Sequence, residues 1–305
     1  MNRDLLIRVG TALVLLPLVI WLIWLGGLWF ALLVGGAAAL CSLELNLLAL
    51  SAPHAAEPAA PADLSRKERQ KARAGAEAGK AATDGGLSGA AVVSIGAAFA
   101  LPLLDAIEVP FLSFKVVLAA VIVISFADAL LFERDLSRAP LRVSIALLGA
   151  VYPGLMMSAL IRIRQLPLHP EWWIILTLVV TWWNDTGGYF AGRAFGKHKL
   201  FERISPKKTW EGALGGLFLA TVGALGVKFF WIPELPWWAA AVIALGASIL
   251  GPLGDLSESM LKRSFGAKDS GTLLPGHGGM LDRIDALLFN APFVLLCARL
   301  LVAPG

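Results

Sequence analysis

The chain has few charged residues for its length. Only 16% of its 305 residues are Asp, Glu, Lys or Arg, while 57% are hydrophobic. A soluble domain carries roughly 25% charged residues. This deficit argues against a soluble globular protein. Together with its long apolar runs, it predicts an all-α polytopic integral membrane protein.

Cysteine and histidine are also scarce. The two cysteines, Cys41 and Cys297, lie inside apolar runs. This excludes a disulfide framework and favours two small buried side chains. One histidine, His277, lies near the main charged cluster, so a zinc site is disfavoured. The Walker A and G-x-S-x-G sequences are absent, which argues against a P-loop NTPase and an α/β-hydrolase.

Nine apolar segments are long enough, or nearly so, to cross a bilayer. The first is expected to be an uncleaved span, because it is longer than the apolar region of a signal peptide. The third is short and rich in alanine. The nine segments are 9–25, 28–50, 89–104, 114–132, 143–160, 172–190, 212–230, 237–253 and 284–302.

The distribution of Lys and Arg predicts the orientation. If the N-terminus is cytoplasmic, 21 of the 26 basic residues fall on the cytoplasmic side. The positive-inside rule therefore favours a cytoplasmic N-terminus and an outside C-terminus. Arg162 and Arg164 run against this trend.

The chain divides into four regions by composition. Residues 1–50 form a two-span region, 89–170 the central spans and 171–305 a catalytic membrane region. Residues 51–88 are rich in Ala, Pro, Lys and Arg and have little apolar bulk, which predicts a cytoplasmic linker. A solvated spacer is favoured over attraction to anionic lipid.

A first polar block extends over residues 184–212. Asn184 and Asp185 lie near the inner end of a span, where ionisable residues usually mark function. Ser205 is expected to cap a helix that starts at Pro206, which would make Lys207, Lys208 and Thr209 a phosphate site. A capped helix with a positive-inside anchor is the alternative. Gly187, Gly188, Gly192 and Gly196 allow either close helix packing or close ligand approach.

A second polar block extends over residues 254–285. If the preceding span continues as a helix, Asp255, Glu258 and Lys262 share one face. A turn at Lys268-Asp269-Ser270-Gly271 and a flexible Pro275–Gly279 stretch follow. Asp282 and Asp285 then begin the last span on one helix turn.

These residue types suit metal and phosphate. Carboxylates converging from two helix ends are ligands that Mg²⁺ prefers, and the bases suit phosphate oxygens. Those bases are Lys262, Arg263, Lys268 and Arg283. Glu44 and Asp128 are lone acids in earlier spans, where helix packing or an interfacial role is favoured over catalysis.

The two polar blocks resemble the sequence motifs of the phosphatidate cytidylyltransferases. The matching positions are Asn184 to Gly187, Ser205 to Gly212, Gly254-Asp255-Leu256, Glu258-Ser259, Lys262-Arg263, Lys268-Asp269, Gly271, Leu274-Pro275, His277-Gly278-Gly279, Asp282-Arg283 and Asp285. The resemblance covers about the C-terminal 120 residues of the chain, and the N-terminal half matches only in hydropathy.

The resemblance implies the transfer of a cytidylyl group from CTP to phosphatidate, which releases pyrophosphate. It implies Asp255 and Asp282 as Mg²⁺ ligands, with a monovalent cation as a possible neighbour. Lys207, Lys208, Lys262, Arg263 and Arg283 would contact phosphates. The other implied substrate contacts are Asn184, Asp185, Ser205, Thr209, Lys268, Asp269, His277 and Asp285.

The expected setting is the inner (plasma) membrane, with the site facing the cytoplasm, no nucleic-acid partner and a homodimer as one option. Two alternative functions stay open, one as an enzyme and one as a transporter. A CTP-dependent transferase acting on another lipid phosphate would need the same site. An ion-coupled transporter using Asp128 and Asp185 is disfavoured, because internal repeats are not evident.

Overall fold

The computed structural model describes residues 3–51, 87–107, 114–133, 135–202, 204–271, 273 and 278–301. The predicted 51–88 linker therefore lies almost wholly outside the described residues.

The regular secondary structure of the described chain is helical apart from one short hairpin, which was not predicted from the sequence. Its elements in chain order are α1 (Arg3–Leu25), α2 (Gly27–Ser51), α4 (Gly89–Ile107), α5 (Phe114–Phe132), α6 (Ala139–Ala150), the π-helical turn η1 (Val151–Leu155), α7 (Met156–Arg164), α8 (Pro170–Phe195), β1 (Lys199–Phe201), β2 (Ser205–Thr209), α9 (Trp210–Trp231), α10 (Trp237–Ser264) and α11 (Leu281–Leu301).

Seven helical segments of the described chain are long and apolar enough to cross a membrane, counting α6, η1 and α7 as one. The predicted all-α membrane protein is thereby confirmed. Helix α1 contributes a shorter apolar stretch, Leu13–Leu25, and α8 carries Glu171, Asp185 and Arg193. A count of nine spans stays a prediction.

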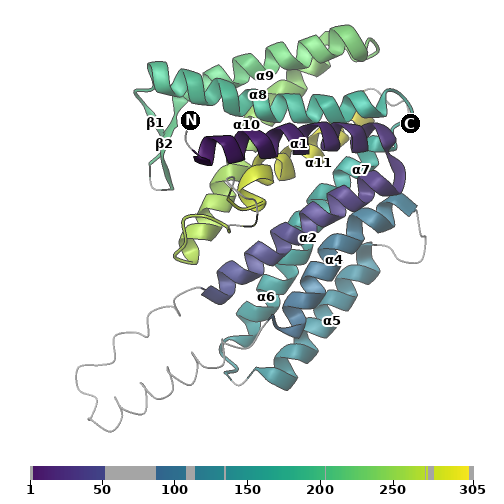
Figure 1. The fold of residues 1–305 in the computed structure, drawn as a ribbon, viewed down its shortest axis with the longest axis vertical. Helices are drawn as coiled ribbons and strands as arrows, with labels where there is room; N and C mark the ends of the chain where they lie inside the picture. Colours follow the sequence, from purple (N-terminus) through teal and green to yellow (C-terminus); the bar gives the residue numbers. More distant parts are fainter. Residues whose placement is uncertain are drawn as a thin grey trace.

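The helices form two groups (Figure 1). Helices α8, α9, α10 and α11 pack on one another and lie beside α1. Helices α2, α4, α5, α6 and α7 form the second group, and α7 packs on α11 across the boundary. Helix α1 begins, and the hairpin lies, at one end of the first group, whereas α11 ends at the other (Figure 1).

The hairpin between α8 and α9 corrects one prediction. Ser205 does not cap a helix, because Ser205–Thr209 is a strand that pairs antiparallel with β1. Helix α9 begins at Trp210, and Thr209 is its N-cap, with its Oγ1 accepting the Gly212 N–H at 3.1 Å. Lys207 and Lys208 therefore project from a strand that leads into the helix.

Glycines bring α8 and α9 close together, which confirms the packing interpretation of the 187–196 glycines. A Cβ placed on Gly212 would lie 2.9 Å from the Gly188 carbonyl oxygen. A Cβ on Gly192 would lie 3.2 Å from Thr209 Oγ1. Small residues of this kind let helix backbones approach closely where apolar lipid gives little driving force for association.

The two arginines that run against the positive-inside trend are both neutralised. Arg162 donates two hydrogen bonds to Asp105, at 3.0 and 2.7 Å. Arg164 pairs with Glu171 at 2.8 Å and donates to the Ile23 and Trp24 carbonyls at the end of α1. Trp172 stacks on Trp231 close by. These arginines therefore join helix ends and are not free positive charges.

The α8–α9 contact predicts a difference between two glycines of α9. A Cβ on Gly216 would lie 2.7 Å from the Asn184 carbonyl oxygen, whereas one on Gly226 would have nothing within 4 Å. We expect Gly216→Ala to destabilise the protein by roughly 1–3 kcal/mol through overpacking. Gly226→Ala should be neutral or slightly stabilising. Thermal unfolding in detergent checks this, and equal melting temperatures for the two variants would contradict it.

Candidate functional site

The C-terminal end of α10 carries the first half of the candidate site. The helix continues beyond its apolar part to Ser264, which is the condition under which Asp255, Glu258 and Lys262 share one face. Lys262 Nζ lies 2.6 Å from Glu258 Oε2 one turn earlier. The Glu258 side chain is only 1% exposed, so an ionised carboxylate at this position requires a partner such as Lys262.

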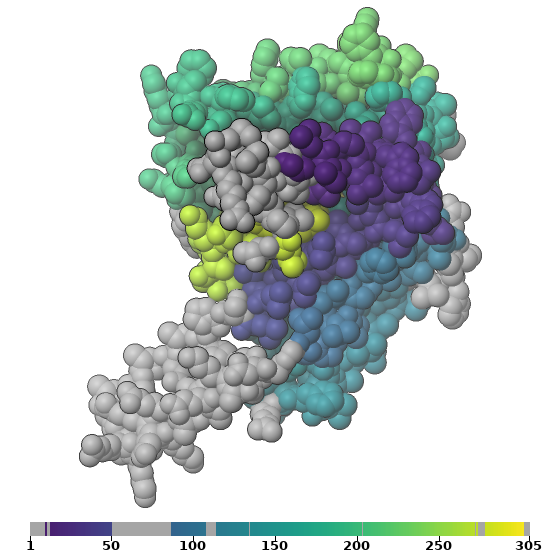
Figure 2. Space-filling view, viewed as in Figure 1, coloured from purple at the N-terminus to yellow at the C-terminus, as the bar shows by residue number. Residues whose placement is uncertain are grey.

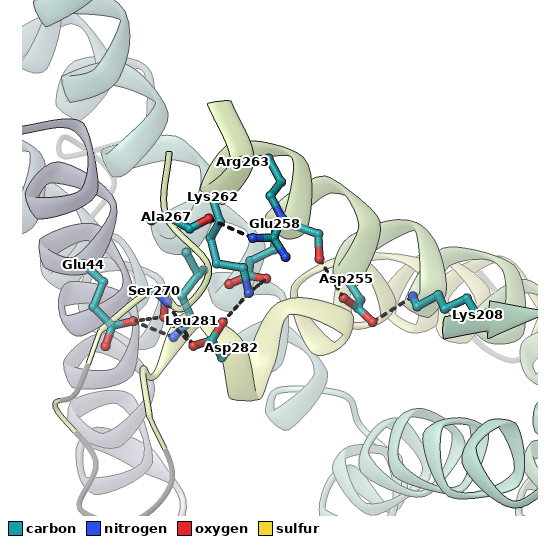
Figure 3. A network of polar contacts seen from close by, with 11 residues as sticks. Glu44, Lys208, Asp255, Glu258, Lys262, Arg263, Ala267, Ser270, Leu281 and Asp282 are labelled. Atoms are coloured by element: carbon teal, nitrogen blue, oxygen red, sulfur yellow. Dashed lines mark hydrogen bonds and ion pairs between the residues drawn. The ribbon is translucent and has the colours of Figure 1, made fainter. Parts of the chain in front are cut away.

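The first turn of α11 supplies the second half. Asp282 Oδ1 lies 2.5 Å from the same Lys262 Nζ. Its other oxygen accepts hydrogen bonds from the Ser270 N–H at 3.1 Å and the Ser270 hydroxyl at 3.0 Å. Lys262 therefore joins the two helix ends (Figure 3).

Three carboxylates from these helix ends form a compact group. One oxygen each of Asp255, Glu258 and Asp285 lies within 4.8 Å of the others. Glu258 Oε1 is buried and has no hydrogen-bond partner among the described residues. A buried unpaired carboxylate oxygen is costly, and this donor set fits a hard divalent cation. Asp282, the other acid predicted as a ligand, has Lys262 and Ser270 as its partners.

The hairpin brings positive charge to this group. Lys208 Nζ lies 2.7 Å from Asp255 Oδ2 and 3.1 Å from the Pro252 carbonyl oxygen. Asp185 of α8 lies within electrostatic range of both Asp255 and Lys208. The two polar blocks of the sequence therefore meet in one place, which neither block alone could establish.

The remaining predicted site residues differ in their exposure and in their partners. Arg263 is exposed and donates to the Ala267 carbonyl at 3.2 Å. Asn184 is buried between Gly216 and Gly251, and Thr209 is occupied as a helix cap. Residues Lys207, Lys268, Asp269 and Arg283 are exposed, Ser205 is half-buried and His277 lies outside the described residues.

Two acids were not assigned to the site from the sequence. Glu258 was explained by its pairing with Lys262, but it also belongs to the carboxylate group. Glu44 of α2 was expected to pack between helices. Its carboxylate instead accepts hydrogen bonds from Ser270 Oγ, Met280 N and Leu281 N. The sequence offered one indication that Glu44 belongs to the site, namely that it is an acid inside an apolar helix. By contrast, Asp128 pairs with Arg142 at 3.4 Å, which agrees with the expected role in helix packing.

The fold and the site define a class of protein. It is a helical membrane protein in which carboxylates and amines gather where α10 ends, α11 begins and β2 approaches. Figure 2 shows the end of α10 at the molecular surface, close to α2. Such a site can hold a cation and anionic phosphate groups together.

Comparison with known proteins identifies the family. Residues 78–301 match the model of the cytidylyltransferase family, so the chain belongs to that family. A phosphatidate cytidylyltransferase of Bacillus subtilis (strain 168) is 43% identical over 152 residues, which are 50% of this chain and 56% of that protein. One from Staphylococcus saprophyticus is 42% identical over 151 residues, covering 50% and 57% respectively. The match thus spans little more than half the length of these relatives.

The Lys262 bridge predicts a strong effect on stability. We expect Lys262→Met to destabilise the protein by about 3 kcal/mol, because it leaves Glu258 buried without its counter-charge. Adding Glu258→Gln should restore part of the loss, since the two residues are coupled. Thermal unfolding of the single and double variants checks this. Lys207→Met, at an exposed position, serves as the control. If the stability changes of the two single substitutions simply add in the double variant, the proposed coupling is contradicted.

Proposed function

We propose that the protein transfers the cytidylyl group of CTP to phosphatidate, forming CDP-diacylglycerol and pyrophosphate. The observation that carries this proposal is the carboxylate group of Asp255, Glu258 and Asp285 with Lys208 and Lys262 beside it, at helix ends of a family member. The names of the relatives supply the lipid substrate.

The chemistry requires positioning more than it requires a strong base. A phosphatidate oxygen is already ionised and attacks the α-phosphorus of CTP. The bond from that phosphorus to the β-phosphate's bridging oxygen breaks, and pyrophosphate leaves. The protein must hold two anions together and neutralise the charge on the leaving group.

In this proposal the lysines and arginines of the site hold the two anions and neutralise the charge on the leaving group. Lys208 projects from β2 toward Asp255, and the ammonium group of Lys262 on α10 contacts Asp282 of α11. Lys207, Arg263 and Arg283 are exposed around them, where they would contact phosphate oxygens. The further substrate contacts that we propose are Asn184, Asp185, Ser205, Thr209, Lys268, Asp269 and His277.

A Mg²⁺ ion fits the acids of the site. Asp255, Glu258 and Asp285 would hold it, and Asp282 stays a predicted ligand from the sequence. When bound, the ion would neutralise phosphate oxygens and the leaving pyrophosphate. Glu258 Oε1, which is buried and has no hydrogen-bond partner among the described residues, supports this assignment. A monovalent cation beside the divalent one remains part of the proposal.

We further propose nine spans, a cytoplasmic N-terminus and a site at the cytoplasmic face of the inner membrane. The hairpin, the end of α10 and the start of α1 lie at one end of the helices, and α11 ends at the other (Figure 1). CTP is water-soluble and the phosphatidate head group lies at the interface, so a site at helix ends meets both.

An assay of the purified protein tests the function. With CTP, Mg²⁺ and phosphatidate in detergent, we expect CDP-diacylglycerol and an equal amount of pyrophosphate. Removal of divalent cations by a chelator should abolish turnover, and added Mg²⁺ should restore it. A panel of other lipid phosphates tests specificity. No product, under conditions in which a known enzyme of this kind works, would refute the proposal.

Cysteine labelling tests the orientation. Cys41 and Cys297 are buried, so introduced cysteines can be read separately. Ser137 lies in the α5–α6 connection and Leu168 in the α7–α8 connection, and both are exposed. A membrane-impermeant maleimide added to intact cells should label Leu168→Cys and not Ser137→Cys. The opposite pattern would invert the proposed orientation.

A further inference from the structure

Glu44 is an acid inside an apolar membrane helix. It lies in α2, its side chain is 1% exposed, and its position precedes the 78–301 stretch that matches the family. Burying a carboxylate is costly unless hydrogen bonds replace its water. The location of its hydrogen-bond donors therefore shows which part of the structure this acid stabilises.

Two of its donors belong to the start of another helix. Glu44 Oε1 accepts the Met280 N–H at 2.8 Å, and Oε2 accepts the Leu281 N–H at 2.8 Å. Helix α11 begins at Leu281. The first N–H groups of a helix lack partners within it, and the helix dipole favours a negative charge there. Glu44 thus supplies from α2 what an N-cap residue would supply locally.

The loop backbone fits closely around this carboxylate. A Cβ on Gly271 would lie 3.0 Å from Glu44 Oε1, and one on Gly279 would lie 2.8 Å from Oε2. Any larger residue at these two positions would push the acid away from its donors. Gly271 and Gly279 therefore leave the space that the Glu44 carboxylate occupies.

The third donor links Glu44 to the acids and bases of the site. Ser270 Oγ lies 2.9 Å from Glu44 Oε2 and 3.0 Å from Asp282 Oδ2, so one hydroxyl proton is shared between two carboxylates. Asp282 in turn contacts Lys262, which contacts Glu258. Figure 3 shows Glu44 and Lys208 approaching this network from opposite sides.

We propose that Glu44 is a positioning residue of the site: it anchors Ser270 and the first turn of α11, and so holds Asp282 and Lys262 in their working geometry. The proposal rests on the proposed function for its kinetic consequence, and on the hydrogen bonds alone for its structural consequence. It makes the N-terminal half of the chain a contributor to the site and not only a membrane anchor.

Three variants of α2 separate positioning from general packing. Glu44→Ala removes the acceptor. Glu44→Gln keeps the length and one oxygen, but places an NH₂ group against a donor. Ser42→Ala is the matched control, because Ser42 is equally buried on α2 but faces Ser94 of α4 at 3.2 Å.

Steady-state kinetics give the first readout. We expect kcat to fall about 100-fold for Glu44→Ala and by a smaller factor for Glu44→Gln, because small displacements of positioned groups are costly. The KM for CTP should change little, since Lys207 and Lys208 come from the hairpin. Ser42→Ala should match the wild type.

Amide hydrogen exchange without substrates gives the second readout. Exchange at Met280 and Leu281 should rise about tenfold in both Glu44 variants, while α8 stays protected. Wild-type kcat and wild-type exchange in Glu44→Ala would overturn the proposal. So would a uniform rise in exchange across α8 and α9, since that would show loss of fold alone. An inactive wild type would refute the proposed function, and the exchange result would still decide the role of Glu44.

Discussion

The rest of the site depends on one constraint: several carboxylates lie close together at helix ends in a membrane protein, and their charge must be offset. One oxygen each of Asp255, Glu258 and Asp285 lies within 4.8 Å of the others, so these acids repel one another when ionised, and Glu258 is almost completely buried. Lys262 stabilises this arrangement by pairing with Glu258 and with Asp282 at once. Removing one partner of a buried pair leaves an uncompensated charge, so the acids and bases must be present together.

This requirement explains the surrounding architecture. The hairpin places Lys208 against Asp255, and the glycine contacts of α8 with α9 hold the hairpin in place. Glu44 holds the start of α11 from the opposite side. The acids therefore receive support from both groups of helices, although the polar sequence blocks lie only in the C-terminal half.

Local patterns could be predicted from the sequence, whereas contacts across the fold could not. The i, i+4 spacing of Glu258 and Lys262 predicts their pairing once α10 continues past the apolar run. The helix start at Ser205 was wrong, because pairing with Lys199–Phe201 makes that segment a strand and moves the cap to Thr209. The contact between Glu44 and Leu281 joins residues far apart in the chain, and no local spacing encodes it.

We propose that the carboxylates of α10 and α11 form one divalent cation site. Titration with Mn²⁺, followed by electron paramagnetic resonance on the purified protein, measures this without relying on turnover. We expect one binding site whose affinity falls at least about tenfold in Asp255→Asn, since a ligand charge is lost. Asp135→Asn, which changes an exposed acid in the α5–α6 connection, should leave the affinity unchanged. Equal Mn²⁺ affinity in the wild type and Asp255→Asn would contradict a shared cation site.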